Sequence, residues 1–320
     1  MKNKIIIVTG DPNSINSELI FKCWRKINSS LKKKIYLIGS YDLILKQFKK
    51  LNYPIKISKV KNLDANVKGK NLKIIDINLK FKNPFKVSRK VSSKYVLNSL
   101  HLAHKLAISS NNGIINCAIS KLLLGNKNIG VTEFLAKKCN IRNKSEVMLI
   151  NNKKLSVSPI TTHISLKDVS SKINRKIISN KIKTIQVWFK KKFNKKPKLA
   201  ILGLNPHNAE LKNKSEERKI IIPTVNHLRK LGINIKGPLV ADTVFVNDYK
   251  NFDVIIGMYH DQVLGPFKTM FKFDAINITL GLKYLRVSPD HGTASNIIGK
   301  NKGNYISLLR CIHFLNKNKK

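Results

Sequence analysis

The sequence predicts an α/β fold in which parallel strands are joined by crossover helices. Short runs rich in β-branched residues alternate along the chain with longer amphipathic stretches, and this alternation is typical of such folds. The chain has 320 residues, of which 42% are hydrophobic, so it can bury a substantial core. Its length corresponds to about two domains or one large α/β unit. No internal repeat is visible, and we therefore expect a doubly wound or related architecture.

The expected elements follow this alternation in order. Each expected strand is a short apolar run, and these runs lie at 5–9, 34–39, 73–77, 113–119, 199–204 and 253–258. Each expected helix carries apolar residues at helical spacing, at 14–28, 94–109, 132–139, 174–193 and 216–231. Another helix is expected to start at 165–168, and the basic segment 189–198 is interpreted as a helix end before the strand at Leu199.

The most unusual property of the chain is its charge. Lysine and arginine number 62 against 17 acidic residues, which gives a net charge of +45. Such an excess raises the possibility of nucleic-acid binding, because basic residues release the counterions of phosphates. Only eight of the basic residues are arginine, the side chain that reads phosphates and bases with a bidentate fork, and the lysines are spread along the chain. We interpret most of this charge as compositional, so nucleic acid is an unlikely partner.

The sequence also restricts the compartment. No apolar run approaches the ~18 residues that a membrane span needs. The first apolar run, Ile5 to Val8, is too short for a signal peptide and is interpreted as a strand. The four cysteines, Cys23, Cys117, Cys139 and Cys311, form no C-x-x-C motif. These features predict a reduced, cytoplasmic protein without disulfides, a cysteine metal site or a membrane segment.

Three histidines share a common context. His163, His207 and His260 each follow an apolar stretch, so each is expected at the carboxyl end of a strand or in the adjoining loop. Open α/β sheets bind ligands at this edge. Three neutral imidazoles with an open position would suit a catalytic divalent metal, although each histidine alone could equally be a loop or packing residue. His101 and His104 are a rival pair, but their segment is an ordinary amphipathic helix.

Three further side chains follow His260 at regular intervals. Lys268, Asn277 and Arg286 are separated by nine residues each, and Arg286 is one of only eight arginines. An amide and two cations near a metal would suit a small phosphorylated or carboxylated substrate, because charge-assisted hydrogen bonds hold such anions strongly. Any single lysine in so basic a chain could instead be a surface charge. The chain contains neither G-x-G-x-x-G nor G-x-x-x-x-G-K-[ST].

Seven motifs, in order along the chain, resemble those of the 4-hydroxythreonine-4-phosphate dehydrogenase family of pyridoxal phosphate (pyridoxine) biosynthesis. They are TGDP at 9–12, GVTEFLA at 130–136, TTHISLKDV at 161–169, GLNPH at 203–207, GPLVADT at 237–243, MYHDQ at 258–262 and DHGTA at 290–294. The resemblance implies an isocitrate/isopropylmalate-dehydrogenase-like fold, with two α/β domains and a cleft between them. The first domain would comprise 1–125 and 287–320 and face the nucleotide. The second, 126–286, would provide metal, substrate and dimer contacts, with the active sites of a homodimer at the subunit interface.

The resemblance also assigns residues to an oxidoreductase site. It implies one divalent metal, zinc, magnesium or cobalt, on His163, His207 and His260, with Asp242 and Asp261 close by to orient a histidine. The implied substrate contacts are Thr132, Lys268, Asn277 and Arg286. The implied contacts of NAD or NADP are His291, Gly292, Thr293 and Ala294. The reaction would be metal-dependent oxidation of 4-phosphooxy-L-threonine to a 2-amino-3-oxo acid, which loses carbon dioxide to give 3-amino-2-oxopropyl phosphate.

The chain departs from the family pattern at several points and is a somewhat divergent member. Val131 stands where the family carries a substrate-contacting histidine, and Asn116-Cys117-Ala118 replaces Thr-Gly-Pro. Other positions have lost glycines, namely Ser14, Asn16, the segment 209–214 and Val263. These departures leave alternatives open. The chain could act on a related four-carbon phosphorylated hydroxy acid, could be a catalytically weakened metal-binding homologue, or could be a lysine-rich nucleic-acid binder.

Overall fold

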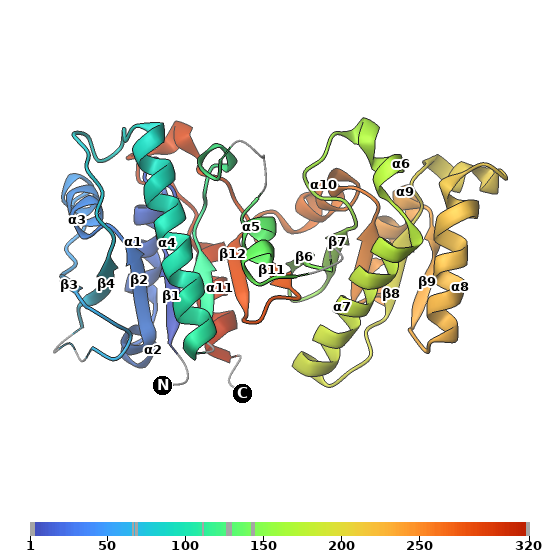
Figure 1. The fold of residues 1–320 in the computed structure, drawn as a ribbon, viewed down its shortest axis with the longest axis horizontal. Helices are drawn as coiled ribbons and strands as arrows, with labels where there is room; N and C mark the ends of the chain where they lie inside the picture. Colours follow the sequence, from blue (N-terminus) through green and yellow to red (C-terminus); the bar gives the residue numbers. More distant parts are fainter. Residues whose placement is uncertain are drawn as a thin grey trace. The chain divides into compact units, whose positions relative to one another are not determined.

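The structure is a computed structural model, and it describes residues 4–65, 67, 70–110, 112–125, 130–141 and 145–317. The chain divides into two compact units. The first comprises residues 1–138 and 283–320, and the second comprises 139–282. Both are α/β units, as the alternation of the sequence predicts (Figure 1).

The first unit is built on a parallel sheet with the strand order β3-β4-β2-β1-β5-β12. Its strands are β1 (Ile5–Val8), β2 (Ile35–Gly39), β3 (Ile57–Lys59), β4 (Leu72–Asp76), β5 (Gly113–Asn116) and β12 (Arg286–Pro289). β1 lies between β2 and β5, and all four of its side chains are buried because helices cover both faces of the sheet. This is the doubly wound arrangement that the sequence predicts.

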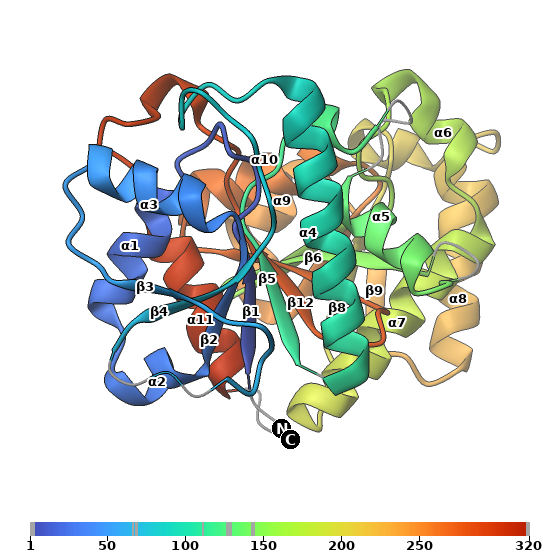
Figure 2. The same ribbon diagram turned by 60° about the vertical axis from the view of Figure 1, so that its left-hand side comes forward.

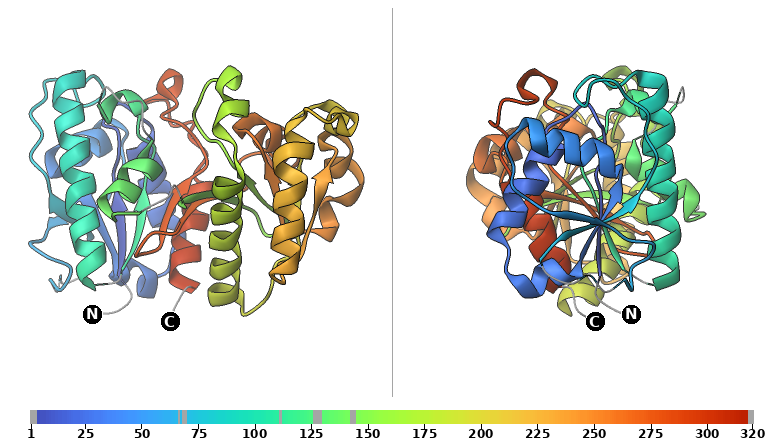
Figure 3. Two further views of the ribbon diagram at one scale, coloured as in Figure 1. Left: turned by 45° about the vertical axis from the view of Figure 1, so that its right-hand side comes forward. Right: turned by 90° about the vertical axis from the view of Figure 1, so that its left-hand side faces the viewer.

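Helices occupy both faces of this first sheet. On one face α1 (Asn16–Lys26) packs against α3 (Tyr41–Lys50) and α11 (Ile306–Lys317), and α4 (Arg89–Ser110) lies on the other (Figures 2 and 3). The remaining helices are α2 (Ser29–Lys34), α5 (Val131–Lys138) and the 3₁₀ turns η1 (Lys121–Leu123) and η7 (Ser295–Ile297). Asn28 and Ser40 cap α2 and α3 by accepting hydrogen bonds from backbone N–H groups, which is why those helices begin where they do.

The second unit contains a mixed sheet with the order β11-β6-β7-β10-β8-β9. Its strands are β6 (Val147–Asn151), β7 (Ser156–Pro159), β8 (Leu199–Leu202), β9 (Ile235–Leu239), β10 (Val254–Gly257) and β11 (Ile276–Leu280). β6 is antiparallel to both of its neighbours, whereas β7, β10, β8 and β9 are parallel. The carboxyl ends of β7, β10 and β8 therefore share one edge, where the histidines are expected.

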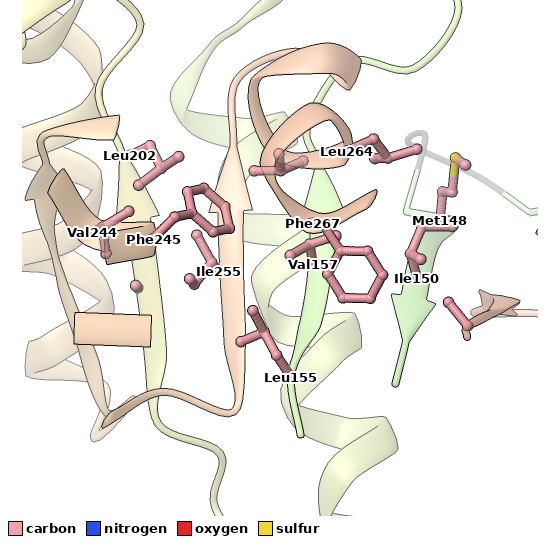
Figure 4. Packing of buried hydrophobic residues seen from close by; sticks show 13 residues of the cluster. Met148, Ile150, Leu155, Val157, Leu202, Val244, Phe245, Ile255, Leu264 and Phe267 are labelled. Carbon is pink, nitrogen blue, oxygen red and sulfur yellow. The ribbon is translucent and has the colours of Figure 1, made fainter. Parts of the chain in front are cut away.

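The helices of the second unit enclose its sheet. They are η2 (Leu166–Asp168), α6 (Val169–Lys172), α7 (Arg175–Phe193), η3 (Pro206–Leu211), the π-turn η4 (Glu217–Ile221), α8 (Ile222–Lys230), α9 (Ala241–Thr243), the π-turn η5 (Val244–Asp248), η6 (Tyr249–Asn251) and α10 (His260–Phe271). Apolar side chains of α10 and of the α9–η5 segment, including Phe267 and Phe245, pack on β7, β8 and β10 (Figure 4). Phe267 is fully buried, so α10 and its first residue, His260, rest on a rigid core.

All of the predicted elements are present. All six expected strands and all five expected helices occur, and α7 ends at Phe193 with Asn194 in a left-handed conformation before β8, as the basic segment suggested. The sequence did not predict β3, β6, β7, β9, β11 and β12, nor helices α2, α3, α10 and α11. β7 and β12 contain serine and proline, and α10 contains Gly265-Pro266, so local patterns gave no clear signal there.

The unit boundaries differ in detail from the predicted division. The predicted division assigns residues 126–138 and 283–286 to the second domain. In the structure they belong to the first compact unit. Within the first unit the ring of Phe134 in α5 stacks on His101 of α4, with centroids 5.5 Å apart. His104 of α4 lies 3.0 Å from the Tyr284 hydroxyl. These contacts join α5 and the segment 283–286 to α4. In them His101 and His104 act as packing residues.

Candidate active site

The structure places the three predicted histidines at one edge of the second sheet. His163 lies in the loop after β7, His207 in η3 after β8, and His260 at the first residue of α10 after β10. The rings of His163 and His260 are neighbours, with centroids 5.6 Å apart and planes inclined by 39°. Imidazole nitrogens are common ligands of divalent metals, so this pair is a candidate metal site.

A carboxylate lies next to His260. Oδ1 of Asp261 is 2.6 Å from Nδ1 of His260. An ionised Asp261 accepts a hydrogen bond from the Nδ1 proton, so Nε2 is left as the nitrogen that can bind a metal. That Asp261 orients a metal-bound His260 stays a prediction. Asp242 is exposed in α9 of the same unit.

His207 lies in a strained turn. Residues 207–211 all have a left-handed backbone, with φ between 48° and 57°, although none of them is glycine. Left-handed residues with a side chain cost roughly 1 kcal/mol or more each, and glycine avoids most of this cost. The lost glycines of 209–214 therefore matter here. Ser14, Asn16 and Val263, in contrast, have no positive φ, so those replacements are tolerated without strain.

This strain gives a testable prediction for Ala209, whose φ is 50°. We expect Ala209→Gly to raise the free energy of unfolding by about 1 kcal/mol, because glycine adopts this conformation without the Cβ clash. Urea denaturation measures the change. Ala136→Gly, the same substitution in the right-handed helix α5, serves as the control and should lower stability. A decrease for Ala209→Gly would show that the turn is not strained.

The three histidines do not converge in a single chain. In the parts of the chain that the structure describes, no three His, Cys, Asp or Glu side chains are placed to hold one metal ion. His163 and His260 are paired, but His207 does not join them in such a group. The three-histidine metal site therefore stays a prediction.

In the first unit the predicted substrate residues Arg286 and Thr132 are in contact. Arg286 begins β12 and is only 3% exposed. Its Nη1 donates to Oγ1 of Thr132 at 3.2 Å, and its Nε donates to Oδ1 of Asn116 at 2.5 Å. Burial lowers the pKa of Arg286 to about 10, with an opposing contribution from Glu133, so the guanidinium stays cationic at neutral pH. The result is a buried, oriented cation.

The sequence did not reveal Asn116 as a site residue. Asn116 was visible only as a departure from the Thr-Gly-Pro pattern, yet it is the buried last residue of β5 and binds Arg286. A polar residue at the carboxyl end of a buried strand was the available signal. Its partnership with Arg286 could not be inferred, because the two residues are 170 positions apart.

The expected cofactor loop, His291–Ala294, follows β12 and lies against the turn after β1. The backbone N–H of Ile15 donates to the Thr293 carbonyl at 3.2 Å. The β1 turn is tight, because Gly10 has φ +76° and a Cβ there would lie 2.5 Å from the Ala118 carbonyl oxygen. Asn16 also ties this turn to Ala118 at the end of β5, with Nδ2 at 2.8 Å from the carbonyl oxygen. The loop thus sits at the carboxyl edge of the first sheet, where doubly wound folds bind ligands.

The other two predicted substrate residues belong to the second unit. Lys268 lies in α10, about 12 Å along the helix axis from His260 at 1.5 Å per residue. Asn277 lies in β11, and its amide oxygen is buried without a hydrogen-bond partner among the described residues. A buried acceptor without a partner is costly in a native protein, and a ligand that donates a hydrogen bond would satisfy it.

Together these features define an α/β enzyme, with charged and polar side chains placed at the carboxyl edges of two sheets. Comparison with known proteins identifies its family. The family model described as pyridoxal phosphate biosynthetic protein PdxA matches residues 30–315. A 4-hydroxythreonine-4-phosphate dehydrogenase of Sulfurihydrogenibium sp. (strain YO3AOP1) is 39% identical over 93% of this chain and 92% of its own length. The chain belongs to the PdxA family of pyridoxal phosphate biosynthesis and is an oxidoreductase of the dehydrogenase type.

Three more proteins are similar to this chain. A putative D-threonate 4-phosphate dehydrogenase of Oceanobacillus iheyensis is 34% identical over 71% of this chain and 69% of its own length. The crystal structure of a 4-hydroxythreonine-4-phosphate dehydrogenase from Klebsiella pneumoniae matches with a TM-score of 0.84 at 27% identity, covering 98% of this chain and 97% of that one. A likeness to an isocitrate dehydrogenase, with a TM-score of 0.50 and 11% identity, concerns the fold alone. The predicted family and fold class are confirmed.

None of the described helices is long and apolar enough to cross a membrane.

Proposed function

We propose that this enzyme oxidises 4-phosphooxy-L-threonine with NAD+ or NADP+ in the cytoplasm. The product would be a 2-amino-3-oxo acid that decarboxylates to 3-amino-2-oxopropyl phosphate. The observation that carries this proposal is the 39% identity to a 4-hydroxythreonine-4-phosphate dehydrogenase over almost the whole chain. The buried Arg286–Thr132 pair and the neighbouring rings of His163 and His260 support it, because the first suits an anionic substrate and the second suits a metal.

His163, His207 and His260 are the residues that would hold a divalent metal. Three imidazoles suit zinc or cobalt better than magnesium, which prefers oxygen ligands. A bound divalent metal supplies Lewis acidity, which lowers the pKa of a substrate alcohol. Asp261 would keep the His260 ring in one orientation by accepting the Nδ1 proton, which would leave Nε2 as the nitrogen that can bind a metal.

The complete histidine set would be assembled in a homodimer. This assignment is supported by the exposed apolar side chains that accompany the histidine segments. Leu166, three residues after His163, is 68% exposed, and Leu211, at the end of the His207 turn, is 42% exposed. Large apolar side chains exposed beside a candidate site favour coverage by another protein surface. A second copy of the chain is the simplest such surface, since it would also supply the missing ligand.

The remaining residues would bind and orient the reactants. Arg286 and Lys268 would hold the phosphate and carboxylate groups, and Thr132 and Asn277 would fix the orientation of the substrate. The substrate hydroxyl would lose its proton as its carbon transfers a hydride to the nicotinamide, so that the alcohol is oxidised to a ketone and NAD(P)+ is reduced. The loop of His291, Gly292, Thr293 and Ala294 would bind the dinucleotide.

A second candidate substrate is D-threonate 4-phosphate, which carries a hydroxyl in place of the amino group. It is favoured by the 34% identity to the Oceanobacillus protein and by Val131, which removes a polar side chain at the start of α5. An apolar residue at this position would lose a contact to a polar substrate group.

The test is reduction of NAD+ or NADP+ with each of the two substrates, with and without a chelator. The variants are His207→Ala and, as a matched control, His227→Ala, whose histidine is exposed in α8. The proposal expects turnover of 4-phosphooxy-L-threonine that stops on chelation and in His207→Ala, but not in His227→Ala. Turnover of D-threonate 4-phosphate alone would establish the second candidate. Turnover that survives both chelation and His207→Ala would overturn the metal assignment, and no turnover with either substrate would indicate a weakened homologue.

A further inference from the structure

A chain of hydrogen bonds connects the three segments that carry the predicted metal ligands. Oγ1 of Thr161, two residues before His163, donates to the Met258 carbonyl at 2.7 Å. The backbone N–H of Met258, two residues before His260, donates to Oε1 of Gln262 at 2.7 Å. Nε2 of Gln262 then donates to the carbonyl of Gly203 at 2.7 Å, four residues before His207. Gln262 is the only side chain in this path that bridges two segments through both of its polar atoms.

The residues around Gln262 leave space for its side chain and hold the turn that carries it. A Cβ on Gly257 would lie 2.9 Å from Oε1 of Gln262 and 2.6 Å from Cγ1 of Val263, so glycine leaves room for the first turn of α10. Val263 is fully buried and fixes this turn on the sheet. The Gln262 amide is therefore held between the ends of β8 and β10. Its two hydrogen bonds require one acceptor and one donor, and the glutamine amide supplies both on a single group.

A second buried side chain anchors the His207 segment beside Gln262. Glu217, which is 0% exposed, accepts hydrogen bonds on Oε1 from the backbone N–H groups of Leu204 and Asn205, at 2.7 and 2.9 Å. Gln262 holds the carbonyl of Gly203, the residue immediately before them. Three consecutive residues leading to His207 are thus fixed by two side chains. Of these two side chains, only Gln262 also binds the segment that follows β10, through the N–H of Met258.

We propose that Gln262 is a positioning residue that holds the His207 segment against the His260 segment, and thereby fixes how each copy of the chain presents these two histidines to a divalent cation. Gln262 is not itself a ligand in this proposal. Groups that orient ligands in this way change metal affinity by about 10- to 100-fold when they are removed. The inference rests on the proposed function for its metal, but the coupling between the segments is a property of the chain without metal.

The test compares Gln262→Glu with Asn152→Asp in the full-length chain. An ionised glutamate keeps the acceptor for the Met258 N–H but has no donor for the Gly203 carbonyl, so it severs only the link to the His207 segment; both measurements are therefore made above neutral pH, where the carboxyl is deprotonated. Asn152 provides the matched control, because its amide also bridges a backbone N–H, that of Lys154, and a backbone carbonyl, that of Asp274. It lies between β6 and β7, at the opposite end of β7 from His163.

Two measurements separate the inference from the proposed function. Hydrogen–deuterium exchange of the metal-free protein should become faster in both 203–209 and 257–264 in Gln262→Glu, and in neither in Asn152→Asp. Cobalt titration followed by visible absorption should show affinity about 10- to 100-fold weaker, with an altered ligand-field spectrum, in Gln262→Glu only. Unchanged exchange in 203–209, or wild-type cobalt affinity in Gln262→Glu while His260→Ala loses cobalt, would overturn the inference. Coupled exchange in a wild-type protein that binds no cobalt would support the coupling and refute the metal assignment instead.

Discussion

Replacing Arg286 with lysine is expected to lower kcat/KM for the phosphorylated substrate by about 100-fold, close to 3 kcal/mol. The substitution keeps a positive charge but removes the planar guanidinium, whose Nε and Nη1 are held by Asn116 and Thr132. A lysine ammonium is a point charge at the end of a flexible chain, so it would not keep both contacts and the same direction towards an anion. Loss of these contacts should also lower stability by about 1–2 kcal/mol, because Asn116 and Thr132 are buried.

Steady-state kinetics and urea denaturation measure the two effects of Arg286→Lys. The control is Arg175→Lys in α7, since the Arg175 side chain is exposed and donates to the Lys219 carbonyl. This variant should retain wild-type kcat/KM. Wild-type kinetics in Arg286→Lys would remove Arg286 from the substrate site, and its buried contacts would then be purely structural.

Replacing Asn277 with leucine is expected to change stability and activity in opposite directions. Leucine has the same number of side-chain heavy atoms and a similar branched shape, but it removes the buried amide oxygen that has no partner among the described residues. Removing such a group should raise the free energy of unfolding by about 1 kcal/mol. The loss of an acceptor for the substrate should lower kcat/KM by about 100-fold.

The control for Asn277→Leu lies on the neighbouring strand. Asn151, at the end of β6, donates from Nδ2 to the Ser156 hydroxyl at 2.9 Å. Asn151→Leu should lower stability, because it breaks a hydrogen bond, and should leave kcat/KM unchanged. If Asn277→Leu also lowered stability and kept its activity, Asn277 would be a structural residue with a partner outside the described contacts.

The fold class, the family and the order of many of the elements can be predicted from local patterns in the sequence. Apolar runs such as Ile5 to Val8 indicate buried strands because their periodicity is local, and the DHGTA and GLNPH motifs are contiguous. It also marked the histidines, because each follows such a run. A segment with a mixed local pattern cannot be predicted in this way. An example is β12, which begins with a buried arginine.

Which of these residues meet depends on how the strands pair and pack in three dimensions. The rings of His163 and His260 are neighbours because β7 and β10 are adjacent parallel strands, although the residues are far apart in the sequence. The left-handed turn at His207 and the Gln262 bridge depend on hydrogen bonds to segments up to 59 positions away. The partnership of Asn116 with Arg286 depends on the pairing of β5 with β12. Strand order is set by packing of the whole sheet, so no local pattern in the sequence contains it.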